Sequence, residues 1–147
     1  MYFKDVTDKH YTLKNMKGFH DNIEELTLAN TKFRQVLYTS AHSQLVLMCL
    51  KPMEEIGMET HEENDQFFRI ESGHGKAVVD GHEYLLADGM GIIVPAGAQH
   101  NIINTSDTDV MQMYTIYSPA HHEDGTVHVT KADAMKDDEE FEGVTTE

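Results

Sequence analysis

Short runs of β-forming residues dominate the hydrophobic pattern between Phe33 and Tyr117. Turn residues separate these runs at regular spacing, which is typical of an all-β sandwich or barrel. The clearest turn is Asp80-Gly81, because this dipeptide favours positive φ and predicts a tight hairpin. The pattern therefore predicts eight strands, over residues 33–39, 44–51, 66–71, 76–80, 83–87, 91–94, 101–104 and 111–117.

Two of the predicted strands, residues 45–50 and 111–117, are apolar on nearly every position rather than on alternate ones. A barrel strand with one solvated face should alternate. The outer face of this part of the barrel is therefore expected to be covered, either by the segment that precedes the barrel or by a second subunit. Since closed pairs are the commonest oligomers, we expect a homodimer.

The segments that flank the barrel carry weaker patterns. Residues 22–26 could form a short helix or part of an extended arm. Thr130, followed by Asp133 three residues later, predicts the capped start of a short helix. The acidic tail after this helix is expected to aid solubility or to fray. The chain is thus divided into an N-terminal arm (1–30), a barrel (31–119) and a C-terminal segment (120–147).

Composition narrows the class of protein. A chain of 147 residues with 39% hydrophobic residues suits one domain, and no apolar run is long enough to span a membrane. The first residues include no apolar stretch of the kind that a secretory signal has, so none is expected, and the single cysteine, Cys49, excludes a disulfide framework. Cys49 lies in an apolar run and is expected to be a small buried hydrophobe. We therefore expect a cytoplasmic protein.

The net charge of −15 limits the classes of binding partner that we expect. Nucleic acids and anionic membranes need clustered Lys and Arg, so neither is an expected partner. The barrel also lacks the cationic cluster that a phosphorylated or multiply anionic substrate would need. The expected ligand is a small neutral or weakly charged organic molecule.

One stretch, from Gly89 to Asn104, follows the pattern G-x5-P-x-G-x2-H-x3-N. Pro95 and Gly97 predict a tight turn at the end of a strand, so that His100 lies near the start of the next one. Alternation places His100 and Asn104 on one face of that strand. If this face is the barrel interior, the imidazole enters an apolar cavity, where a metal ion is its natural partner.

This stretch resembles the second conserved motif of the cupin family at all five fixed positions, which implies a jelly-roll β-barrel and makes His100 a metal ligand. The family's first motif, G-x5-H-x-H-x3–4-E-x6-G, is matched in part. Gly73 corresponds to its last glycine and His61 to its second histidine. Gln66 stands where the family has glutamate, and Glu59 where it has the first histidine.

The resemblance implies a ligand set of Glu59, His61, Gln66 and His100 for one divalent transition metal ion: iron, manganese, nickel, zinc or copper. Like the family's three histidines and one glutamate, this set carries one negative charge. It approaches the two-histidine, one-carboxylate arrangement of non-haem iron sites. Gln66 is a weak ligand and could instead orient a water molecule or substrate, or bond a backbone group. Glu63 is a rival to Glu59, because it continues the same strand face.

The remaining histidines have weaker claims to a site. His74 and His82 flank turns and are expected to be solvated. His121, His122 and His128 are best interpreted as part of a polar loop, although they could line the cavity mouth or form a second metal site. On the last predicted strand, parity alone suggests that Gln112 and Tyr114 point inward and contact a ligand.

The resemblance is to small single-domain cupins described as mannose-6-phosphate isomerase-like, but a fold does not fix a function. The leading hypothesis is a metal-dependent enzyme of the oxygenase or isomerase type, with Glu63 or Asp65 as a candidate base. The alternative is a non-enzymatic cupin that binds or senses a small molecule. A third hypothesis gives the metal a purely structural role.

Overall fold

The computed structural model describes residues 3–4, 11–12 and 15–147, so part of the predicted N-terminal arm lies outside the described residues. Strands β1 (Phe3–Lys4) and β2 (Tyr11–Thr12) pair antiparallel. Helix α1 (Ile23–Ala29) follows, and the side chain of its N-cap residue Asn22 accepts the N–H of Glu25. Of the two alternatives for this segment, the structure shows the helix.

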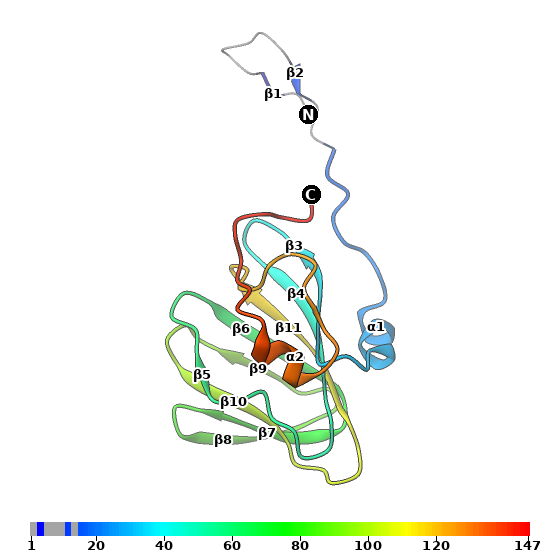
Figure 1. The fold of residues 1–147 in the computed structure, drawn as a ribbon, viewed down its shortest axis with the longest axis vertical. Coiled ribbons are helices and arrows are strands. Elements are labelled where there is room, and N and C mark those ends of the chain that lie inside the picture. Colours follow the sequence, from blue (N-terminus) through cyan, green and yellow to red (C-terminus); the bar gives the residue numbers. More distant parts are fainter. Residues whose placement is uncertain (1–2, 5–10, 13–14) are drawn as a thin grey trace.

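The barrel consists of two antiparallel sheets packed face to face (Figure 1). All eight predicted strands are present, with ends displaced by no more than two residues, which confirms the all-β jelly-roll prediction. The strand β5 (Glu59–Thr60) and the strand β12 (Val127–His128) were not predicted. The other strands of the barrel are β3 (Arg34–Thr39), β4 (Gln44–Leu50), β6 (Asp65–Ser72), β7 (His74–Val79), β8 (His82–Ala87), β9 (Gly91–Val94), β10 (Gln99–Asn104) and β11 (Met111–Ser118). The larger sheet has the strand order β12-β3-β4-β11-β6-β9, and the smaller sheet has the order β5-β10-β7-β8.

The turn between β7 and β8 has the predicted conformation. Asp80 and Gly81 have φ angles of 45° and 82°, and the flanking residues Val79 and His82 are paired across the hairpin. Positive φ at both central residues is what a two-residue hairpin turn requires. The Asp-Gly prediction is confirmed.

The hydrophobic core fills the space between the two sheets. Val46, Phe68 and Met113 enter it from the larger sheet, and Ala77 and Ile102 from the smaller one, each with an exposed fraction of 0%. Burying such a side chain contributes about 1.5–3 kcal/mol for the larger residues. This core fixes the strand parity that decides which polar side chains face inward.

Helix α1 covers the outer face of the larger sheet. Leu47 and Cys49 alternate with the core residues of β4 and are nevertheless buried, and α1 packs against β4, β6 and β11. The amide of Gln112 donates to the carbonyls of Leu28 and Asn30, each at 2.9 Å. The apolar outer face is thus explained by the N-terminal segment, and the homodimer remains a prediction.

The predicted inward orientation of Gln112 and Tyr114 is wrong. Gln112 is bonded to the end of α1, and Tyr114 packs against Phe67 on the same outer face, with 6.2 Å between ring centroids. The inward positions of β11 are those of the opposite parity, including Thr115 and Tyr117. Alternation along the strand could not show which face points to the core, because both faces of this strand are covered.

The C-terminal segment is part of the barrel. Strand β12 pairs with β3, and the short helix α2 (Lys131–Lys136) begins with the predicted capping box of Thr130 and Asp133. The prediction that the acidic tail frays is wrong. The side-chain carboxylate of Glu147 accepts a hydrogen bond from the Tyr38 hydroxyl at 2.7 Å, so the tail folds back onto the barrel. Within the described part of the chain, both helices are too short to cross a membrane.

Candidate metal centre

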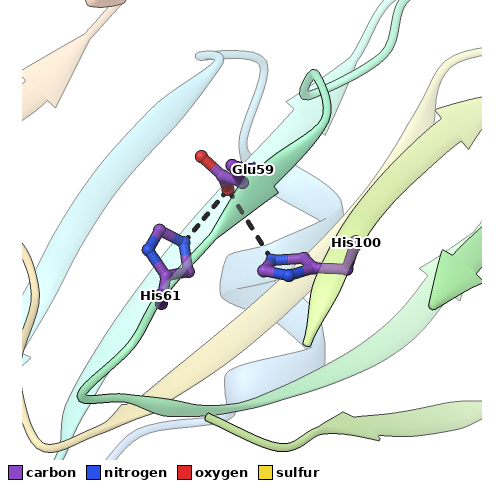
Figure 2. A group of neighbouring side chains, drawn as sticks. All are labelled: Glu59, His61 and His100. Atoms are coloured by element: carbon purple, nitrogen blue, oxygen red, sulfur yellow. Dashed lines mark ion pairs between the residues drawn. The ribbon is translucent and has the colours of Figure 1, made fainter. Parts of the chain in front are cut away.

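Glu59, His61 and His100 lie together at one end of the smaller sheet (Figure 2). Glu59 belongs to β5 and is paired directly with His100 on β10 in the antiparallel ladder. His61 follows β5 and, being two residues from Glu59, points to the same side. The register between these two strands therefore brings residues about forty positions apart in the sequence into one group.

The distances in this group are short. Oε1 of Glu59 lies 3.2 Å from Nε2 of His61 and 3.8 Å from Nε2 of His100. One possible ligand atom from each of the three residues lies within 4.8 Å of the others. His61 and His100 are buried, with exposed fractions of 8% and 2%. The arrangement could hold one metal ion away from bulk solvent.

The proton positions also favour a cation. Nδ1 of His100 lies 3.0 Å from the carbonyl oxygen of Ala98, which can only accept, so Nδ1 carries the proton. In the neutral ring, Nε2 then presents a lone pair toward Glu59. Among the described residues, Nε2 of His61 and Nε2 of His100 are both buried without a hydrogen-bond partner.

The carboxyl group of Glu59 is held in its charged form. Burial by itself raises its pKa, but the close contact with His61 and the electrostatic effects of His61, His100 and Arg34 outweigh this, so that the pKa is lowered overall. An ionised carboxylate between two imidazole nitrogens is the electronic requirement of a divalent metal site.

The turn between β9 and β10 positions both histidines. Gly97, with a φ of 87°, donates its N–H to the carbonyl of His61 at 2.9 Å. The N–H of Ala96 donates to Asp65 at 2.9 Å. Asp65 is exposed and supports this turn, and Glu63 is exposed and outside the group of three. Glu59, rather than Glu63, is the acidic residue that lies with the histidines.

Gln66 is buried on β6, with an exposed fraction of 1%. Its side-chain nitrogen donates to the Thr115 hydroxyl at 3.0 Å, while its side-chain oxygen is buried with no partner among the described residues. The residue opposite it on β11 is Tyr117, another inward side chain. The amide is thus oriented by Thr115, with its oxygen left available.

His121 and His122 lie in a loop, as predicted, but this loop packs inward against the candidate site, which agrees with the alternative that they line the cavity. The ring of His121 stacks on Tyr117 and lies 4.2 Å from the ring of His61. His122 is 5% exposed and bridges the Tyr117 hydroxyl, at 3.2 Å, and Glu139, at 2.6 Å. The loop turns inward because the buried Gln44 accepts the backbone N–H groups of both histidines.

Burial keeps these two imidazoles neutral. It lowers the pKa of His121 to about 4, with the nearby charges of His122 and His61 acting in the same direction. Burial also lowers the pKa of His122, against the opposing effect of Glu139. The wall above the three candidate ligands is therefore aromatic and uncharged at neutral pH.

The other histidines divide into two groups. His74 and His82 are exposed, as predicted. His128 is 4% exposed, so the loop interpretation is wrong for this residue. Its Nε2 lies 2.9 Å from Asp137 and its Nδ1 lies 3.2 Å from Arg34. Sequence reasoning missed Arg34 entirely, although its rarity was a signal: the chain has only two arginines.

Comparisons with known proteins agree with this architecture. The family model described as Cupin domain matches residues 46–117. An uncharacterised protein of Acanthamoeba polyphaga mimivirus is 48% identical over 75% of this chain and 71% of its own. The uncharacterised protein YrkC of Bacillus subtilis is 43% identical over 87% of this chain and 73% of its own.

Among solved structures, BH2720 of Bacillus halodurans is similar, with a TM-score of 0.80 and 38% identity over 82% of this chain and 96% of that one. The region matched by the family model includes Glu59, His61 and His100. Fold, motif and comparisons agree: the chain belongs to the cupin family.

Proposed function

We propose that Glu59, His61 and His100 bind one divalent transition metal ion, and that the protein is a metal-dependent enzyme acting on a small organic molecule. One observation carries the proposal: two buried imidazole nitrogens without partners face one ionised carboxylate. Buried polar atoms without partners are costly, and a shared cation would satisfy all three groups.

The donor set fits such an ion. Two imidazole nitrogens and one carboxylate oxygen suit iron, manganese, nickel, zinc or copper, and three protein ligands leave positions for water or substrate. When bound, the metal would polarise a carbonyl or hydroxyl group, or bind oxygen if it is iron. This supports an oxygenase- or isomerase-type reaction. The free oxygen of Gln66 makes this residue a candidate for a weak fourth ligand or for orienting a water molecule.

Three uncharged aromatic side chains, those of His121, His122 and Tyr117, lie together beside His61. The ionised carboxylate of Glu139 accepts a hydrogen bond from the Nδ1–H of His122. Burial opposes ionisation of Glu139, but the hydrogen bond from His122 outweighs it and lowers the pKa of Glu139 to about 2. Nε2 of His122 can then accept the Tyr117 hydroxyl proton in a hydrogen bond. Burial raises the pKa of Tyr117, so its hydroxyl stays protonated. We expect these groups to exclude water from the metal site and to contact the substrate.

Metal analysis tests the first part. The protein is purified without chelator, reconstituted with each candidate metal and measured by elemental analysis. Wild type and a control variant of the exposed histidine, His74→Ala, should bind about one equivalent, and His100→Ala should lose the metal while keeping its thermal unfolding transition. Less than about a tenth of an equivalent in wild type would contradict the proposal.

Two further measurements separate an enzyme from the alternative, a non-enzymatic binding or sensing cupin. Binding of azide or nitric oxide to the ferrous form would show open coordination positions and would argue against a closed structural site. A substrate panel then decides between the remaining hypotheses. Turnover supports the enzyme, whereas ligand-dependent thermal shifts without turnover support the binding protein.

A further inference from the structure

A cavity of about 230 Å³ lies next to Glu59, between the barrel and the C-terminal segment. Glu59 forms part of its wall, so the cavity adjoins the candidate metal centre. Apolar side chains, including Phe33 and Ile56, form another part, and the basic residues Arg34 and Lys131 also line the cavity. The volume is at the small end for a ligand site, which suits a molecule of few atoms.

Arg34 stands out in this cavity because no carboxylate among the described residues forms an ion pair with it. The side chain is buried, with an exposed fraction of 9%, and its Nε has no hydrogen-bond partner among the described residues. The other arginine, Arg69, pairs with Glu71 at 3.0 Å. A buried guanidinium without an acid is unusual in a chain with 26 acidic residues.

The guanidinium of Arg34 is nevertheless held in place. Arg34 on β3 is paired directly with His128 on β12. The carboxylate of Asp137 accepts the Nε2 proton of His128 at 2.9 Å, so Nδ1 of His128 is an acceptor. Nη1 of Arg34 donates to this Nδ1 at 3.2 Å. His128 therefore occupies Nη1 of the guanidinium, while Nε has no hydrogen-bond partner among the described residues.

The charges around the cavity favour an anion once a metal is present. Its acids are Glu59, Asp137 and Glu139, and the last two already accept hydrogen bonds from His128 and His122. A divalent ion at Glu59, together with Arg34 and Lys131, outweighs these three negative charges. A ligand with one negative charge would then be attracted, whereas a phosphate ester would find too few cations.

We propose that Arg34 binds the carboxylate of a small organic acid whose other end reaches the metal at Glu59, His61 and His100. The planar guanidinium, whose Nε has no partner among the described residues, matches a carboxylate better than it matches a neutral group. This inference rests on the proposed function, because it places the reacting end of the acid at the metal. It specifies the weakly charged ligand as a monocarboxylate.

Binding of matched probes tests the proposal. Metal-loaded protein is titrated calorimetrically with lactate and 3-hydroxybutyrate, and with the corresponding amides, lactamide and 3-hydroxybutyramide. Wild type and the control Arg69→Gln should bind at least one acid more tightly than its amide. Arg34→Gln should bind that acid about ten- to a hundredfold more weakly, as expected for losing hydrogen bonds to a charged group. Its metal content should be unchanged.

The variant Arg34→Lys controls for a loss of binding that is caused by misfolding, because it keeps the positive charge and most of the aliphatic part of the side chain. Its affinity should lie between those of wild type and Arg34→Gln, since lysine lacks the planar fork. Equal binding of acids and amides, no acid binding by wild type, or full acid affinity in a folded Arg34→Gln would each overturn the proposal. Arg34-dependent acid binding in a protein that takes up no metal would instead contradict only the proposed function.

Discussion

The backbone N–H of Gly97 donates to the carbonyl oxygen of His61 at 2.9 Å, which ties the turn before β10 to the segment after β5. One end of this turn leads to His100, and its middle holds His61. The spacing between the proline-glycine turn and the histidine is thus a geometric requirement, because one turn sets the positions of two candidate ligands.

Replacing Gly97 by alanine tests this link. The residue has a φ of 87°, where an L side chain costs about 1–2 kcal/mol, and its added Cβ would lie 3.6 Å from Glu62. Gly125→Ala is the matched control, with a φ of 77° and no atom within 4 Å of the added Cβ. Urea unfolding should show similar losses of stability in both variants. Only Gly97→Ala should weaken metal binding; an equal effect on metal binding in both would contradict the link.

Gln66→Glu restores the residue that the family motif has at this position. In metal-free protein the new carboxylate is buried near Tyr117 without a cation, so we expect a loss of about 1–3 kcal/mol in the free energy of unfolding. In metal-loaded protein the added charge should tighten metal binding by about tenfold or more. Competition with a chelator measures the affinity. Unchanged affinity would place Gln66 outside the coordination shell.

Glu139→Gln should loosen the C-terminal segment. The carboxylate accepts Nδ1 of His122 at 2.6 Å and the N–H of Glu123 at 2.7 Å. Hydrogen bonds to a charged group contribute about 1.5–3 kcal/mol, so the free energy of unfolding should fall by a comparable amount. The neighbouring exposed residue gives the control variant Glu140→Gln, which should be neutral. Equal stability of the two variants would show that the His122–Glu139 contact does not hold the segment.

Acid should destabilise the metal-free protein in two steps. The pKa values of His121 and His122 are both lowered from 6.5, that of His121 to about 4, so below about pH 6.5 the unfolded state binds more protons and stability falls. The pKa of Glu139 is lowered from 4.5 to about 2, which adds a loss of the same sign between those values. Urea unfolding from about pH 7 to about pH 3 measures both. Glu139→Gln should flatten the curve below about pH 4.5; a curve parallel to wild type would argue against the second step.

Most of the barrel was predictable because its strands are locally encoded. The Asp80-Gly81 turn and the capping box at Thr130 act through neighbouring residues, and both have the predicted geometry. The short strands β5 and β12 were missed because two residues carry no period. They form only because longer strands, β10 and β3, offer them a free edge.

The candidate site was predictable only where a motif described it. Glu59, His61 and His100 were found from spacing, and the structure brings them together. Arg34 and Tyr117 carry no such spacing, because their places depend on pairing with strands far away in the sequence. Strand pairing of this long-range kind cannot be read from a local pattern.

The pairing of Arg34 with His128 also has a consequence for the order in which the barrel and the cavity form during translation. Every strand that surrounds the candidate metal group is encoded before residue 119, so the barrel core can form on the ribosome as soon as those strands have emerged. Asp137, which lines the cavity, and His128, which bonds both Asp137 and Arg34, are translated afterwards. If Arg34 binds the ligand as proposed, a nascent chain would fold before it could bind, and ligand recognition would begin only when β12 has joined its sheet.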